Sequence, residues 1–101
     1  MAEWIRAASI DEIPDDTGKL VEVDGQEIAL FKDRGEICAI HNLCPHAGGP
    51  LAEGGMREGH VMCPWHGWEF NLKTGTCAFN PAIKVPVFKT KTEGPDVFVA
   101  I

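Results

Sequence analysis

The chain has 101 residues, which is enough for one domain with a modest hydrophobic core, so residues 1–101 are treated as a single domain. Fifteen acidic residues against nine Lys and Arg give a formal net charge of −6. This balance argues against a nucleic-acid partner, because phosphates call for clustered basic side chains. No apolar run approaches the roughly 18 residues of a membrane span, and no signal-peptide pattern is visible. We therefore expect a soluble, cytoplasmic protein with no membrane partner.

Short runs typical of β-strands alternate with turn signals such as Asp24-Gly25 and Gly54-Gly55. The one helical signal is a capping box from Ser9 to Glu12, which Pro14 limits to about one turn. This spacing predicts an all-β fold built as an antiparallel meander rather than alternating strands and helices. The predicted strands cover residues 19–23, 27–32, 36–41, 60–62, 85–89 and 97–101.

Two loops rich in Gly and Pro interrupt the strand pattern, and each contains a cysteine followed closely by a histidine. The first gives Cys44-x-His46 and the second gives Cys63-x-x-His66, with sixteen residues between the two pairs. Two thiolates and two imidazoles can converge from such loops. This donor set suits either a zinc ion or a 2Fe-2S cluster in which two histidines replace two cysteines on one iron.

The residues around these donors favour the cluster over zinc. A one-residue gap between Cys44 and His46 is tight for one tetrahedral ion, but it suits ligands of two different irons. The glycines at 48, 49 and 67 let the backbone approach closely and turn N–H groups toward negatively charged bridging sulfides. A bare zinc ion needs no such donors. A zinc-binding interaction module stays as a remote alternative.

Residues 44–51 and 63–68 closely resemble the two cluster-binding loops of Rieske iron–sulfur proteins, and the likeness extends along most of the chain. This resemblance implies three small antiparallel sheets with the cluster-binding loops at one tip. It implies one 2Fe-2S cluster, with Cys44 and Cys63 on one iron and His46 and His66 on the other. Residues 80–82 resemble the proline loop that covers the cluster in that family.

Two departures from the respiratory branch of this family are informative. Respiratory Rieske proteins carry an additional cysteine in each loop, which together form a disulfide, where this chain has Gly49 and Trp65. They also carry a serine and a tyrosine that hydrogen-bond the cluster sulfurs, where this chain has Trp68 and Phe70. The chain therefore resembles the soluble, low-potential Rieske ferredoxins.

The resemblance implies an electron carrier rather than an enzyme. Rieske oxygenases need a second, mononuclear iron held by two histidines and a carboxylate, and only His41 and His60 remain here, both close to the loops. The expected partners are an NAD(P)H-dependent flavin reductase and a terminal oxygenase of the aromatic-ring-hydroxylating type. The alternative is a small subunit of an NADH-dependent nitrite reductase, whose partner is the large subunit.

Several residues outside the motif receive structural interpretations. Cys38 and Cys77 are expected to be buried thiols, with a disulfide between them as the minor alternative. His41 and His60 are expected to be structural or surface residues. Large aromatic residues are expected in the core; they are Trp4, Phe31, Phe88 and Phe98.

Overall fold

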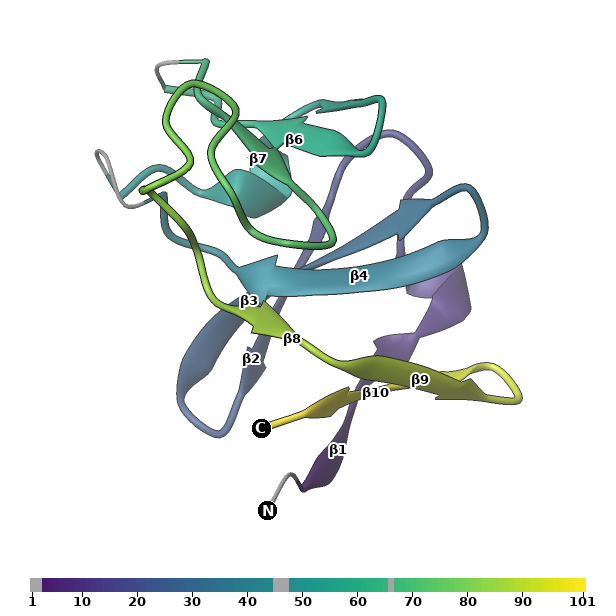
Figure 1. Cartoon of the computed structure of the whole chain (residues 1–101). Helices are drawn as coiled ribbons and strands as arrows, with labels where there is room; N and C mark the ends of the chain where they lie inside the picture. Colours follow the sequence, from purple (N-terminus) through teal and green to yellow (C-terminus); the bar gives the residue numbers. More distant parts are fainter. Residues whose placement is uncertain (1–2, 45–47, 66) are drawn as a thin grey trace.

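The computed structural model describes residues 3–44, 48–65 and 67–101, and these form three small antiparallel sheets, as expected (Figure 1). The first sheet has the order β1-β10-β9, the second β2-β3-β4-β8 and the third β5-β6-β7. Within the described residues no helix is long and apolar enough to cross a membrane. The strands are β1 Trp4–Ser9, β2 Lys19–Val23, β3 Gln26–Asp33, β4 Glu36–His41, β5 Met56–Arg57, β6 His60–Met62, β7 Glu69–Asn71, β8 Val87–Phe88, β9 Thr90–Glu93 and β10 Asp96–Ala100.

The predicted meander is only partly correct. Strands β2, β3 and β4 are consecutive neighbours, and so are β5, β6 and β7. However, β1 pairs with β10 from the other end of the chain, with Trp4 opposite Ala100, and β4 pairs with β8. The six-residue strand β1 was not predicted, because its sequence does not alternate cleanly and its pairing partner lies far along the chain. The capping box is confirmed: the backbone N–H of Ser9 donates to Glu12 Oε1 at 2.9 Å before the short 3₁₀ helix Ile10–Glu12.

Strand β3 forms the centre of the second sheet and divides the core into two parts. Its four consecutive residues Ile28, Ala29, Leu30 and Phe31 are fully buried. Ala29 and Phe31 belong to one apolar cluster, and Ile28 and Leu30 belong to the other, as expected when neighbouring side chains point to opposite faces of a sheet. The cluster that contains Phe31 also contains the buried cysteines 44 and 63, so one half of the core reaches the predicted metal loops.

The aromatic residues were only partly predicted. Phe31 is fully buried and Phe88 is half-buried against the second cluster, but Trp4 is 41% exposed on β1. Its indole and the half-buried ring of Phe98 instead lie beside the ammonium group of Lys91, at 4.8 and 5.5 Å from the ring centres. The contact is a cation–π interaction on the first sheet rather than core packing.

Gly75 joins the third sheet to the second. Its N–H donates to Asn71 O in the turn after β7, and its carbonyl accepts from Val85 N just before β8. The backbone has a φ of +76°, and a Cβ at this position would overlap the carbonyl oxygen of Val85. Glycine is therefore needed for both its conformation and its lack of a side chain.

Replacing Gly75 by alanine should destabilise the protein by about 2–4 kcal/mol, because the left-handed backbone and the overlap with Val85 both oppose the methyl group. Gly25 is the matched control: its φ is +79°, but nothing lies within 4 Å of an added Cβ. Gly25→Ala should cost only the conformational part, about 1–2 kcal/mol. Urea unfolding followed by circular dichroism measures both variants. Equal losses would show that the close approach to Val85 carries no energy.

Candidate metal centre

The two predicted metal loops are closed by the same pair of backbone hydrogen bonds. In the first loop, Cys44 N donates to Gly49 O at 2.9 Å, and Gly48 N donates back to Cys44 O at 2.7 Å. In the second, Cys63 N donates to Trp68 O at 2.7 Å, and Gly67 N donates to Cys63 O at 2.9 Å. The donors and acceptors stand at the same offsets from each cysteine. The two loops are therefore equivalent in their described backbone, and each begins with a cysteine.

The glycine four residues after each cysteine makes this closure possible. Gly48 has a φ of +75° and Gly67 a φ of +73°, a conformation that side chains with a Cβ disfavour. One expectation is corrected here: the N–H groups of these two glycines were expected to face sulfides, but they donate to the carbonyls of Cys44 and Cys63. Their role in the structure is to close the turns.

The strands of the second and third sheets hold both loops at the end of the molecule that lies away from the first sheet (Figure 1). Asn42, at the end of β4, is buried and accepts a hydrogen bond from Leu51 N on its backbone oxygen and from Ala52 N on its side-chain oxygen. This pair of bonds fixes the base of the first loop. The second loop continues directly from β6 and leads into β7, which are paired antiparallel with Val61 opposite Phe70. The strands on either side of each loop thus fix the positions of the two cysteines.

Both cysteines are buried, with 1% of Cys44 and 1% of Cys63 exposed, and both belong to the apolar cluster that includes Phe70. The two loops approach each other at Gly49: a Cβ there would lie 2.9 Å from Cys63 Sγ and 3.2 Å from the indole of Trp65. Sulfur donors shielded from water, on two loops that touch, fit a cluster that needs thiolate ligands and a protected surrounding. The predicted ligands His46 and His66 lie outside the described residues, and so does Ala47.

The remaining cysteines and histidines have structural positions, as expected. Cys38 and Cys77 are buried free thiols in the same apolar cluster, without a disulfide between them. His60 is partly exposed and its Nδ1 lies 3.0 Å from Glu58 O. His41 pairs with Ile28 at the end of β4. Within the part of the chain that the structure describes, no three His, Cys, Asp or Glu side chains converge to hold a metal ion.

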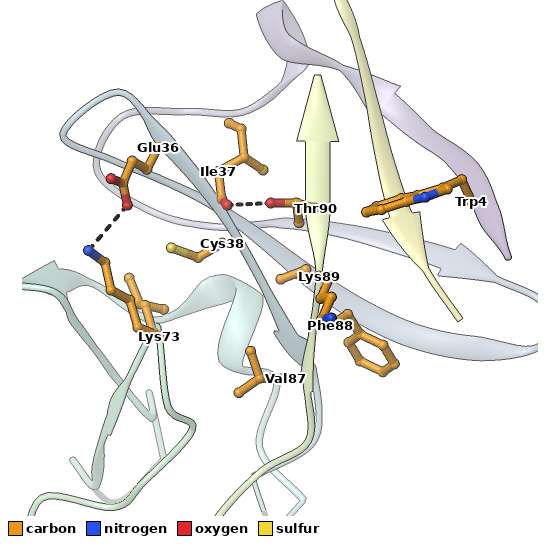
Figure 2. A pocket seen from close by; sticks show the side chains of 11 residues that line it. Trp4, Glu36, Ile37, Cys38, Lys73, Val87, Phe88, Lys89 and Thr90 are labelled. Atoms are coloured by element: carbon orange, nitrogen blue, oxygen red, sulfur yellow. Dashed lines mark hydrogen bonds and ion pairs between the residues drawn. The ribbon is translucent and has the colours of Figure 1, made fainter. Parts of the chain in front are cut away.

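An open groove of about 470 Å³ lies between β4, the β8–β9 segment and Leu72–Lys73, and Figure 2 shows its lining. The ion pair of Lys73 with Glu36, at 3.2 Å, lies at one end of it. Cys38 is the one cysteine among its described lining residues, and no histidine joins it. Burial raises the pKa of the Cys38 thiol, and the carboxylates of Asp33 and Glu36 add to this. The thiol therefore stays protonated near neutral pH, and the groove offers no metal-binding set.

The small β fold and the two equivalent loops, each with a buried cysteine, suit a protein that holds an iron–sulfur cluster. Comparison with known proteins makes this specific: the Rieske [2Fe-2S] domain model matches residues 3–89. The chain belongs to the Rieske [2Fe-2S] family, and its cofactor is one 2Fe-2S cluster. The sequence-based identification of the family is therefore confirmed.

Three related proteins cover nearly the whole chain. The ferredoxin component of naphthalene 1,2-dioxygenase/salicylate 5-hydroxylase systems from Ralstonia sp is 35% identical over 97 residues, which are 95% of this chain and 93% of the relative. A structure described as the NADH-dependent nitrite reductase small subunit of Mycobacterium tuberculosis is 30% identical, with a TM-score of 0.89 over 100% of this chain and 96% of that chain. A complex of reduced oxygenase and oxidised ferredoxin in carbazole 1,9a-dioxygenase matches with 26% identity and a TM-score of 0.85, over 96% of this chain and 92% of that chain.

Trp68 and Phe70 stand at the positions where the respiratory Rieske proteins have a serine and a tyrosine. Phe70 is fully buried in the cluster that includes Cys44 and Cys63, and Trp68 packs against the same cluster. Neither side chain has a hydroxyl group. Hydrogen bonds to sulfur stabilise the reduced, more negative cluster more than the oxidised one, so their loss lowers the potential. We expect a midpoint near the lower end of the Rieske range, at roughly −150 mV.

Phe70→Tyr should raise this midpoint by roughly 20–65 mV, if one added hydrogen bond favours the reduced state by about 0.5–1.5 kcal/mol. Redox titration at one pH compares the variant with the unmodified protein. Phe98→Tyr is the control, because Phe98 lies on the first sheet, and its midpoint should not move. A wild-type midpoint above about +150 mV would place the protein in the respiratory branch. A low midpoint that Phe70→Tyr leaves unchanged would show that position 70 does not face a cluster sulfur.

Proposed function

We propose that this protein is a Rieske ferredoxin that carries single electrons from an NAD(P)H-dependent flavin reductase to a terminal oxygenase of the aromatic-ring-hydroxylating type. The observation that carries the proposal is the 35% identity to a dioxygenase ferredoxin component along 95% of this chain. The chain itself catalyses no reaction on an organic substrate in this proposal, and it acts in the cytoplasm.

The proposed ligands are Cys44 and Cys63 on one iron and His46 and His66 on the other. Burial of both thiols and the equivalence of their loops support the cysteine assignment. The spacing of the two histidines after these cysteines supports the histidine assignment. When bound, the cluster supplies a reversible one-electron couple. The protein excludes water from the sulfurs and holds the two loops at a fixed separation.

The distribution of charge supports docking through the loop end of the molecule. Residues 43–50, 63–68 and 78–83 contain no Asp, Glu, Lys or Arg, so all of the charged side chains lie outside these segments. Each segment instead exposes an apolar side chain: Leu43 is 41% exposed, Trp65 58% and Phe79 66%. An uncharged apolar surface suits close approach to a partner, while the acidic residues around it steer a basic partner from a distance.

A second candidate function is that of a nitrite reductase small subunit. It is favoured by the match to the Mycobacterium tuberculosis structure, which covers 100% of this chain at a TM-score of 0.89. In that case the electron acceptor is a large reductase subunit rather than an oxygenase. The fold and the cluster are shared by both candidates, so only the identity of the partner separates them.

The ligand assignment is tested by exchanging histidine for cysteine. His46→Cys and His66→Cys each replace a neutral ligand by an anionic one, so any cluster that still assembles should lose the Rieske spectrum and have a much lower potential. Optical and electron paramagnetic resonance spectra of the purified variants measure this. Cys44→Ala and Cys63→Ala should lose the bound iron, whereas the controls Cys38→Ala and Cys77→Ala should retain it. An unchanged spectrum and potential in both histidine variants would remove these residues from the ligand set.

The partner assignment is tested by mixing the reduced protein with each acceptor. The protein is reduced with dithionite, freed of excess reductant, and mixed in a stopped-flow instrument with one of two partners. These are a naphthalene-dioxygenase-type oxygenase with its aromatic substrate and dioxygen, and a nitrite reductase large subunit with nitrite. Reoxidation of the cluster should be faster with the oxygenase. Faster reoxidation by the nitrite reductase would instead establish the second candidate.

A further inference from the structure

Trp65 is exposed at the loop end of the molecule, yet its indole also contacts the opposite loop. Gly49 is buried. A Cβ added to it would lie 2.9 Å from Cys63 Sγ and 3.2 Å from each of the indole carbons Cγ and Cδ2 of Trp65. The indole therefore lies against the backbone of the first loop, beside the sulfur of the second. Glycine is required at position 49 because any larger residue would displace one of them.

We propose that the indole of Trp65 is a non-covalent clasp that holds the two cluster-bearing loops together and covers the Cys63 sulfur. The inference rests on the proposed function, because it takes Cys63 to be a cluster ligand. Trp65 is thus a positioning residue: it acts through Gly49 and Cys63 rather than by binding iron.

Two features of the described residues support a clasp rather than an exposed side chain that only binds a partner. Cys63 is 1% exposed although Trp65, two residues later, is 58% exposed, so the sulfur is shielded from water beside a side chain that is only partly covered. Each loop is also closed separately by its own hydrogen bonds, such as Cys44 N to Gly49 O and Cys63 N to Trp68 O. Those bonds fix the shape of each loop, whereas the contact of Trp65 with Gly49 joins one loop to the other.

The contact predicts slower release of the cluster, because the two loops must separate before a chelator or water reaches the sulfurs. Trp65→Ala should shorten the half-life of the visible cluster absorbance in the presence of excess chelator by roughly two- to tenfold. Trp65→Phe keeps a planar ring in the same place and should restore most of the half-life. Substitutions at Gly49 do not isolate the indole, because an added methyl group would press on Cys63 Sγ as well.

Trp4→Ala is the matched control, since Trp4 is also a partly exposed tryptophan but lies on β1 in the first sheet. Its half-life should equal that of the wild type. Far-ultraviolet circular dichroism of Trp65→Ala and Trp65→Phe should show the three sheets folded at the assay temperature, which separates loss of the loop contact from general unfolding. An unchanged half-life in Trp65→Ala, an equal loss in Trp4→Ala, or no rescue by Trp65→Phe would each overturn the clasp. A wild-type protein that binds no cluster would instead refute the proposed function.

Discussion

The turn closed between each cysteine and the glycine four residues later is the constraint on which the metal centre depends. A glycine N–H reaches back to the cysteine carbonyl only because the backbone at Gly48 and Gly67 has a positive φ. The cysteine N–H is used in the same closure, so backbone hydrogen bonds hold the first and last residues of each turn. Using the same device twice gives two cysteines in equivalent positions.

The rest of the fold serves to hold these turns against each other. Asn42, the one buried polar residue in the described part of the chain, donates to Glu27 Oε1 and accepts from Ala52 N at the base of the first loop. Gly75 allows the turn after β7 to lie directly on the backbone before β8. The Gly75 contact attaches the small third sheet to the segment that leads into β8 of the larger second sheet. A sheet of three short strands would otherwise be only marginally stable.

Burial and exposure divide the metal centre into an inner and an outer part. Cys44, Cys63 and Phe70 belong to one apolar cluster. This cluster keeps water away from the two sulfur atoms and surrounds them with uncharged side chains. Outside it, Trp65 and Phe79 meet solvent on segments without formal charge. A carrier must protect its redox group and yet allow a partner to approach closely. Apolar loops around a buried donor set meet both requirements, because they exclude water and present little desolvation cost on docking.

The sequence by itself determined the family, the all-β class and several strands with their bounds, such as Lys19–Val23, Glu36–His41 and His60–Met62, while the ligand set stays a prediction. These follow from local signals: ligand spacing, Asp-Gly turns and short β-branched runs. Only the tertiary structure showed that β1 pairs with β10, because that pairing depends on a partner at the other end of the chain. The same holds for Trp4, which a composition-based argument places in the core but which lies exposed beside Lys91. It also holds for Trp65 and Gly49, since fifteen residues lie between them along the chain and no local pattern indicates a contact between two loops.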